Sequence, residues 1–109
     1  MRKIEQQIAS AIKSKETKDF GKRDQVYTEG DTTEVVLWGH TIAKIDWSQK
    51  TVKLEDCGYQ TATTKSRMNA VLSAVAPSFG IYQSKHEWFV SGPDGKSEPM
   101  GDGHCIYFS

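Results

Sequence analysis

Hydroxyl-bearing and cationic side chains are concentrated in one short stretch of this sequence, directly ahead of and overlapping an apolar segment. The stretch covers residues 61–69, and its threonine, cationic and amide residues are Thr61, Thr63, Thr64, Lys65, Arg67 and Asn69. Free backbone N–H groups and a partial positive charge gather where a helix begins, and they favour a negatively charged group. If a helix begins here, the hydroxyls and cations would add to an anion site, for a phosphate or for a carboxylate on a partner protein.

Apolar residues at helical spacing predict that a helix does begin here. Met68, Val71, Leu72 and Val75 lie at i, i+3, i+4 and i+7 and form one face. Thr63 or Thr64 is the expected N-cap, because a hydroxyl there accepts a bond from an otherwise unpaired N–H. The structural alternative is that the threonines are ordinary caps and that the cations are solvated. The stretch also lacks the glycines of a phosphate-binding loop.

The rest of the chain predicts the elements that position this helix. Ile4, Ile8, Ala11 and Ile12 indicate an amphipathic helix over about residues 2–15. Strand formers predict a short edge strand at residues 25–28. Two further strands are expected on either side of Gly39, which marks a bulge or a bend, and another over residues 51–56.

Three strands are predicted after the second helix, at residues 80–84, 87–92 and 104–109. The expected fold is therefore α+β: a two-layer domain with a mainly antiparallel sheet of five to six strands covered by two helices, in the order α-β-β-β-α-β-β-β. The length of 109 residues suits a single domain over residues 1–109.

The segment GYQTATTKSRMNAVL resembles a motif of small uncharacterised proteins encoded by bacteriophages, G-[WY]-x-T-x-T-T-K-x-R-[LM]-N. The matching positions are Gly58, Tyr59, Thr61, Thr63, Thr64, Lys65, Arg67, Met68 and Asn69. Upstream, VVLWGHTIAKI resembles a strand of that family, although the order Gly39-His40-Thr41 departs from the family's His-Gly-Asn. The resemblance covers about residues 35–72. It implies a phage origin and supplies no catalytic residue.

Charge and composition narrow the class of function. Lys plus Arg equals Asp plus Glu at 14 each, so no basic excess attracts nucleic acid and a protein partner is favoured. The sequence contains no run of about 18 apolar residues, so no membrane span is predicted. The N-terminus lacks the apolar core of a secretory signal. The predicted location is the host cytoplasm.

Candidate catalytic and metal-ligating residues are scattered along the chain. His40, His86, His104, Cys57 and Cys105 lack the short paired spacing of zinc sites. A Cys–His nucleophile would need His40 to meet a cysteine in space. The cysteines are expected to be free thiols with packing roles. We therefore expect no metal, no cofactor and no catalysis.

These observations favour a phage-encoded, non-catalytic binding protein that engages or inhibits a host or phage macromolecule, such as a defence or nucleic-acid-processing complex. The predicted contact residues are Trp38, His40, Tyr59, Thr61, Thr63, Thr64, Lys65, Arg67 and Asn69. Charge reversal at Lys65 and Arg67 is expected to abolish partner capture with little change in the thermal melt. The alternatives are a nucleic-acid- or nucleotide-binding domain that uses the same helix start, and a small hydrolase or nuclease.

Overall fold

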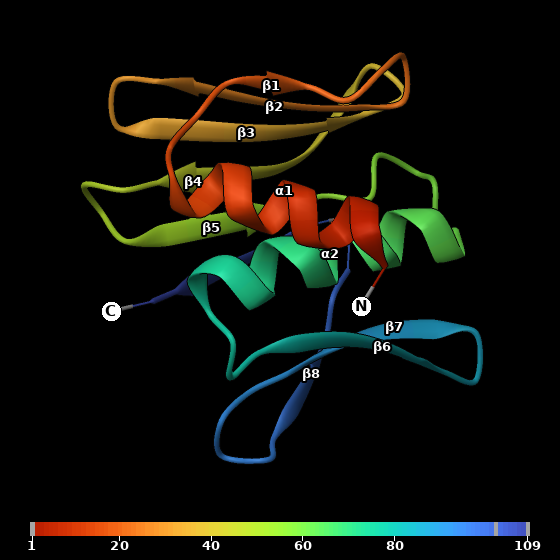
Figure 1. Cartoon of the computed structure of the whole chain (residues 1–109). Helices are drawn as coiled ribbons and strands as arrows, with labels where there is room; N and C mark the ends of the chain where they lie inside the picture. Colours follow the sequence, from red (N-terminus) through yellow and green to blue (C-terminus); the bar gives the residue numbers. More distant parts are fainter. Residues whose placement is uncertain (1, 102, 109) are drawn as a thin grey trace.

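The computed structural model describes residues 2–101 and 103–108 (Figure 1). In these residues the elements follow in this order: α1 (Lys3–Lys13), β1 (Lys18–Asp19), β2 (Asp24–Glu29), β3 (Thr32–Leu37), β4 (His40–Asp46), β5 (Thr51–Leu54), α2 (Ala62–Val75), β6 (Gly80–Ser84), β7 (Glu87–Ser91), β8 (Ser97–Pro99) and β9 (His104–Tyr107). The α+β class, the two helices and the mainly antiparallel pairing are as predicted. None of the described helices is long and apolar enough to cross a membrane.

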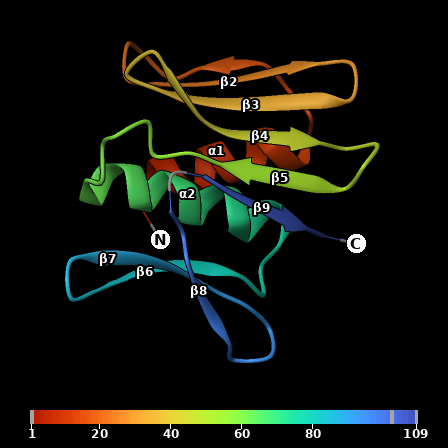
Figure 2. The ribbon, with the colours of Figure 1, turned by 180° about the vertical axis from the view of Figure 1, so that it is seen from behind.

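The strands form two sheets, whereas the sequence predicted one. The larger sheet has the order β1-β2-β3-β4-β5-β9 and the smaller has the order β6-β7-β8, all antiparallel. The two helices lie against one face of the larger sheet, and the smaller sheet lies beyond α2 (Figures 1 and 2). The two-layer expectation is therefore wrong. The last strand leaves its neighbours in sequence and returns to pair with β5.

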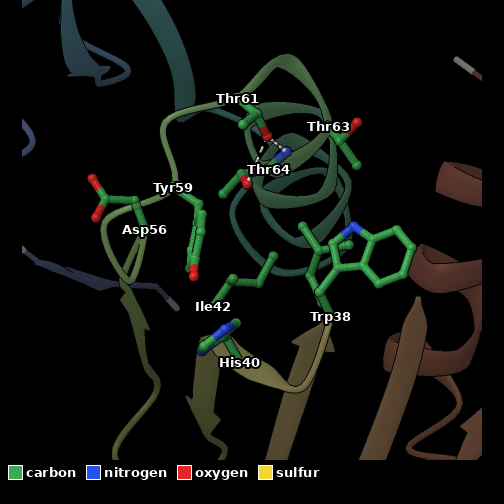
Figure 3. A pocket seen from close by; sticks show the side chains of 9 residues that line it. Trp38, His40, Ile42, Asp56, Tyr59, Thr61, Thr63 and Thr64 are labelled. Atoms are coloured by element: carbon green, nitrogen blue, oxygen red, sulfur yellow. Dashed lines mark hydrogen bonds between the residues drawn. The ribbon is translucent and has the colours of Figure 1, made fainter. Parts of the chain in front are cut away.

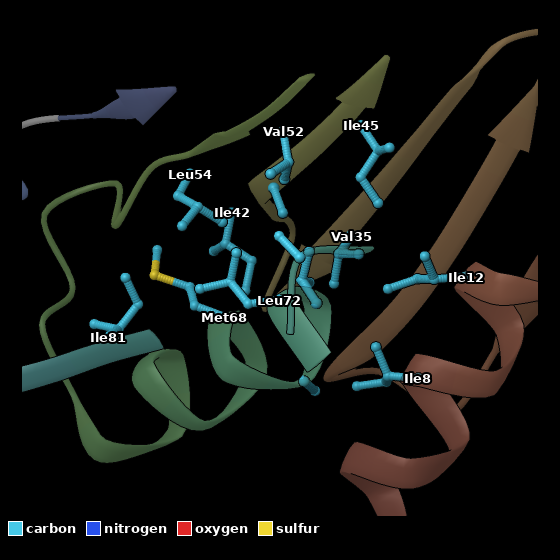
Figure 4. Packing of buried hydrophobic residues seen from close by; sticks show 14 of the residues in the cluster. Ile8, Ile12, Val35, Ile42, Ile45, Val52, Leu54, Met68, Leu72 and Ile81 are labelled. Carbon is cyan, nitrogen blue, oxygen red and sulfur yellow. The ribbon is translucent and has the colours of Figure 1, made fainter. Parts of the chain in front are cut away.

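One cluster of buried apolar side chains holds the helices between the sheets. Ile8 and Ile12 of α1 meet strand residues such as Val35 and Ile45 of the larger sheet, and Met68 and Leu72 of α2 join them (Figure 4). Burying each of these side chains contributes about 1.5–3 kcal/mol. The apolar periodicity therefore predicted both helices correctly, with α1 one or two residues shorter at each end than expected.

The hairpin of β3 and β4 contains a tight turn and a β-bulge, which position Trp38 and Ile42. Its turn is Trp38–Gly39, with both residues at positive φ (51° and 79°), so the bend predicted at Gly39 is confirmed. The bulge lies further along, because Val35 pairs with Ala43 and Val36 with Thr41, which leaves Ile42 as the extra residue. Both Ile42 and Ala43 are consequently buried.

Two strand predictions need correction. The strand at residues 25–28 was expected at the edge, but β2 is covered on its outer side by β1. Neither β1 nor β8 was predicted. Both are short and their side chains are exposed, so they lack the apolar alternation that marks a half-buried strand.

Candidate functional site

A pocket of about 490 Å³ opens where the β3–β4 turn, the loop after β5 and the start of α2 meet (Figure 3). Its lining residues are Leu37, Trp38, His40, Ile42, Asp56, Tyr59, Thr61, Thr63 and Thr64. Six of the nine predicted contact residues are therefore brought together here from two separate segments. Lys65, Arg67 and Asn69 are not among the lining residues.

Two exposed aromatic side chains flank the pocket. The side chains of Trp38 and Tyr59 extend on opposite sides of it (Figure 3), and they are 63% and 55% exposed. The ring of Tyr59 lies 5.0 Å from that of His40, centroid to centroid, at a tilt of 42°. Trp38 stands at φ 51°, a conformation that costs a residue with a Cβ about 1–2 kcal/mol. A large apolar side chain is thus exposed at a strained position.

The loop that presents Tyr59 is held by Asp56. One carboxylate oxygen accepts the backbone N–H of Gly58 and the other accepts the side-chain amide of Gln60, both at 2.8 Å. The backbone carbonyl of Asp56 accepts the N–H of Tyr59, also at 2.8 Å. Sequence reasoning missed Asp56 at this site. Its position two residues before Gly58 was the available signal, because Asp commonly closes such a turn.

The start of α2 forms the upper wall in Figure 3, and its cap differs from the prediction. The residue with extended backbone is Thr61, whose Oγ1 accepts the N–H of Thr64 at 3.2 Å and lies 3.0 Å from the Thr64 hydroxyl. The expectation of Thr63 or Thr64 as N-cap is therefore wrong. Thr64 is buried beneath the first turn. That turn contains no acidic residue, and helix geometry leaves the N–H groups of Ala62 and Thr63 without intrahelical acceptors.

Arg67, a predicted contact residue, lies inside the protein, so the alternative that it is a solvated cation is wrong. Its side chain is 1% exposed, and Nε donates to Oδ1 of Asp24 at 2.8 Å while Nη2 donates to Oδ2 at 3.4 Å. Nη1 donates to the hydroxyl of Ser66 at 3.0 Å. Arg23 donates to Asp24 from the solvent side, at 2.8 Å. The guanidinium of Arg67 therefore joins α2 to β2.

This arrangement sets the ionisation of Asp24. Burial alone raises the pKa of a carboxyl. Hydrogen bonds from Arg67 and Arg23, aided by their charges, outweigh burial and hold the pKa of Asp24 below its ordinary value. The carboxylate therefore stays ionised in the interior at neutral pH.

Asn69 and Lys65 complete the predicted set. The side-chain amide of Asn69 donates to the carbonyl of Ile81 at 3.1 Å and accepts the N–H of Ile81 at 2.8 Å. It thus occupies the open edge of β6 as a neighbouring strand would, and attaches the small sheet to α2. Lys65 is half-buried in the first turn of α2, next to the pocket residue Thr64.

Of the residues considered for nucleophilic or metal chemistry, His40 lines the pocket and Cys57 lies in the loop between Asp56 and Tyr59. Desolvation raises the pKa of the Cys57 thiol, and the carboxylates of Glu55 and Asp56 add to the rise. Its Sγ–H faces the carbonyl of Thr41 at 3.4 Å. A raised pKa disfavours the thiolate that a nucleophile needs. Within residues 2–101 and 103–108, no group of three or more His, Cys, Asp and Glu side chains could hold a metal ion.

Comparison with known proteins adds one finding. A family model described as Kyanoviridae Gp96 protein matches residues 1–107. The chain therefore belongs to the Kyanoviridae Gp96 family of phage proteins, and the phage origin implied by the motif is confirmed. No curated protein and no solved structure matches the chain.

Proposed function

We propose that this member of the Kyanoviridae Gp96 family is a non-catalytic binding protein that engages a macromolecule of the host or the phage. In this proposal the partner is a protein, and the contact surface is the pocket at the start of α2 with Trp38 and Tyr59 at its rim. We further propose that the encounter occurs in the host cytoplasm, with a defence or nucleic-acid-processing complex as the target.

The observation that carries this proposal is the pair of exposed aromatic residues on opposite sides of one pocket. Trp and Tyr are over-represented among the residues that dominate protein–protein binding energy, and such residues gather at pockets. Trp38 adds a second argument. A turn residue at positive φ favours Gly, Asn or Asp, so an exposed tryptophan there worsens folding without adding to the core. Strain of this kind persists at sites of function.

Local charge also favours a protein partner. The chain carries 14 cations and 14 anions, and the pocket lining contains a carboxylate, that of Asp56. Nucleic-acid surfaces rely on clustered Lys and Arg that neutralise phosphates. The motif contains two cations that could bind a phosphate, Lys65 and Arg67, and Asp24 already neutralises Arg67. An apolar or aromatic anchor from a protein partner therefore matches the pocket better than a phosphate backbone.

The test is quantitative capture from phage-infected cells, read by mass spectrometry, with four proteins. We expect wild type to enrich one host or phage protein, and we expect Trp38→Ala and Tyr59→Ala each to reduce that enrichment at least tenfold. Tyr82→Ala is the matched control, because Tyr82 is also an exposed tyrosine but lies on the small sheet. Equal enrichment by all four proteins would remove the pocket from the contact surface.

A second candidate function is nucleotide or nucleic-acid binding at the same helix start. It is favoured by the absence of acidic residues from the first turn of α2 and by Lys65 within that turn. A gel-shift titration with single- and double-stranded oligonucleotides at two salt concentrations tests it. Binding that weakens steeply with salt supports this candidate, and no shift at the lower salt concentration rules it out.

A further inference from the structure

Several elements that are distant in sequence meet at one end of the molecule. The helices α1 and α2 run parallel, and both begin at the end where the pocket opens (Figures 1 and 2). The turns at residues 20–23, 38–39 and 85–86 lie at this same end, which we call the pocket end. The turns at residues 30–31 and 47–50 lie at the opposite end, where both helices finish. The side chains of the first set of elements therefore surround the pocket.

Lysine and arginine side chains are concentrated at the pocket end. The cations that its turns and helix starts contribute are Arg2, Lys3, Lys22, Arg23, Lys65 and Lys85. Lys65 is half-buried and the others are exposed. The three turns at this end contain neither Asp nor Glu, whereas the two turns at the opposite end contain one lysine, Lys50, and one acid, Asp31. The neutral total of the chain therefore conceals an uneven distribution of charge.

Two of these cations are fixed next to residues that line the pocket. The backbone N–H of Trp38 donates to the carbonyl of Arg23 at 2.8 Å, and the side chain of Arg23 is 46% exposed although it donates to Asp24. Lys65 follows Thr64 in the first turn of α2. Positive charge is therefore held beside the aromatic rim and beside the helical wall of the pocket.

Lysine and arginine outnumber the acids at the pocket end. The buried Asp24 is offset by the equally buried Arg67. The remaining acids there are Glu5, Asp19, Asp56 and Glu87. The carboxylates of the first two accept the backbone N–H groups of Arg2 and Gly21, at 3.2 and 2.9 Å, and that of Asp56 closes its own loop. Both helix starts add a partial positive charge, so the surroundings of the pocket are positive overall.

We propose that the pocket end binds an acidic segment of a protein partner, in which Asp and Glu residues surround an apolar or aromatic anchor. This inference rests on the proposed function, because it takes the pocket between Trp38 and Tyr59 as the place where the anchor binds. Protein interfaces commonly combine an apolar centre with a polar rim, and the pocket end has this arrangement. Charges in such a rim speed association and select among partners more than they add affinity.

The lining of the pocket favours an acidic protein over a nucleic acid. Leu37 and Ile42 contribute apolar side chains to the lining, and Asp56 contributes a carboxylate that would repel a phosphate. Single-stranded nucleic acids are bound in grooves whose cations follow the backbone, whereas here the cations surround a pocket. Because a base could still stack on an exposed aromatic ring, an oligonucleotide is included in the test.

The experiment is a titration of the isotope-labelled full chain, followed by NMR, with three short synthetic peptides. Each peptide has one central Phe, flanked on both sides by Glu, by Gln or by Lys. The titrations are made at about 20 and 200 mM salt, because salt screens exposed charges. At the lower salt we expect the Glu peptide to bind at least tenfold more tightly than the Gln peptide, with shifts at Trp38 and Tyr59. At the higher salt most of this preference should be lost.

Two double variants of equal net charge locate the effect. Lys22→Gln with Lys85→Gln removes two cations from the pocket end and should reduce the preference for the Glu peptide at least threefold. Lys13→Gln with Lys50→Gln is the matched control and should leave the preference unchanged, because it removes two cations from the opposite end. Lys50 and Lys85 both stand at positive φ in a turn, at 55° and 50°, so any cost to folding is similar.

Three results would overturn this inference: no preference for the Glu peptide, equal losses in the two double variants, or an oligothymidylate that binds as tightly as the Glu peptide and shifts the same amides. The proposed function is decided separately, by partner capture with Trp38→Ala and Tyr59→Ala. If capture falls in those variants while the Glu peptide shows no preference, the proposed function stands and the acidic partner is wrong.

Discussion

The first turn of α2 and the turn that follows it carry similar polar side chains but differ in what those side chains contact. At the first turn, Thr61 and Thr63 border an open pocket beside Trp38 and Tyr59. In the next turn, Arg67 and Asn69 are bonded to Asp24 and Ile81 of the same chain. A polar motif can therefore combine residues that fix a helix in place with residues that remain available to a partner, and sequence clustering alone does not separate the two.

Replacing Arg67 tests most directly whether the second turn of α2 holds the fold. We expect Arg67→Met to lower the free energy of unfolding by about 3 kcal/mol, because it leaves the carboxylate of Asp24 buried with one of its two partners lost. This corresponds to a fall of about 10–15 °C in Tm for a chain of this size. Urea denaturation monitored by circular dichroism measures it. Arg23→Met, on the exposed side of the same carboxylate, should cost less than about 1 kcal/mol.

This expectation replaces the one drawn from sequence, in which charge reversal at Arg67 leaves the melt almost unchanged. Lys65→Glu, at a half-buried position without an ion-pair partner among the described bonds, now serves as the charge reversal that spares the fold. An Arg67→Met protein as stable as wild type would show that the buried pair does not hold α2 to β2.

The pH dependence of stability sharpens the same contrast. The pKa of Asp24 is depressed in the folded state, so its contribution is present above the pKa of a free aspartate, about 3.9. That contribution is lost as pH falls from this value toward the folded pKa. We expect the free energy of unfolding to fall below about pH 4, measured by denaturation at pH 7, 5 and 3. The double variant Asp24→Asn with Arg67→Met should lose the part of the slope due to Asp24, and an unchanged slope would contradict this assignment.

We expect replacement of Asn69 to have a smaller effect on stability, confined to the small sheet. Asn69→Ala leaves the N–H and C=O of Ile81 without their partners, which costs about 1–3 kcal/mol. We expect faster amide exchange at Ile81 and in β6–β8, with the exchange of β2–β5 little changed. Asn69→Asp is the matched variant, since it keeps an acceptor for the N–H of Ile81 and removes the donor. Uniform acceleration over the whole chain would indicate that Asn69 acts on global stability instead.

Because Thr61 is the N-cap of α2 and Thr63 is not, replacing the two threonines should have different effects on stability. Thr61→Ala removes the acceptor for the Thr64 N–H and should cost about 1 kcal/mol, whereas Thr63→Ala should cost less than about 0.5 kcal/mol. Thermal melts of the two variants measured side by side provide the test. Equal losses of stability in the two variants would contradict the assignment of Thr61 as the N-cap.

The sequence predicted what is encoded locally. Apolar residues at i, i+3 and i+4 define both helices, and alternation in TVKLED predicted a strand with Val52 and Leu54 buried, as observed. The cap was not predicted correctly because Thr61, Thr63 and Thr64 are chemically equivalent in sequence. Only the extended backbone of Thr61 selects it.

What the sequence could not supply depends on distant partners. The burial of Arg67 follows from Asp24, which lies 43 residues away. The division into two sheets follows from β9 pairing with β5 rather than with β6 or β7, although the three strands predicted after α2, which correspond to β6, β7 and β9, have similar composition. At the site, the resemblance and the clustering indicated six of the lining residues, whereas Asp56, Leu37 and Ile42 required the geometry of the turn and the bulge.

The central claim is that the rim of the pocket is available for binding while the buried half of the motif holds the fold. The most direct test is one variant, Trp38→Gly, measured for both Tm and partner capture. Glycine relieves the positive φ of this position, so we expect a Tm equal to or slightly above that of wild type together with loss of at least nine-tenths of the captured partner. A Trp38→Gly protein that captures the partner as wild type does, or that loses stability by more than about 1 kcal/mol, would contradict the account.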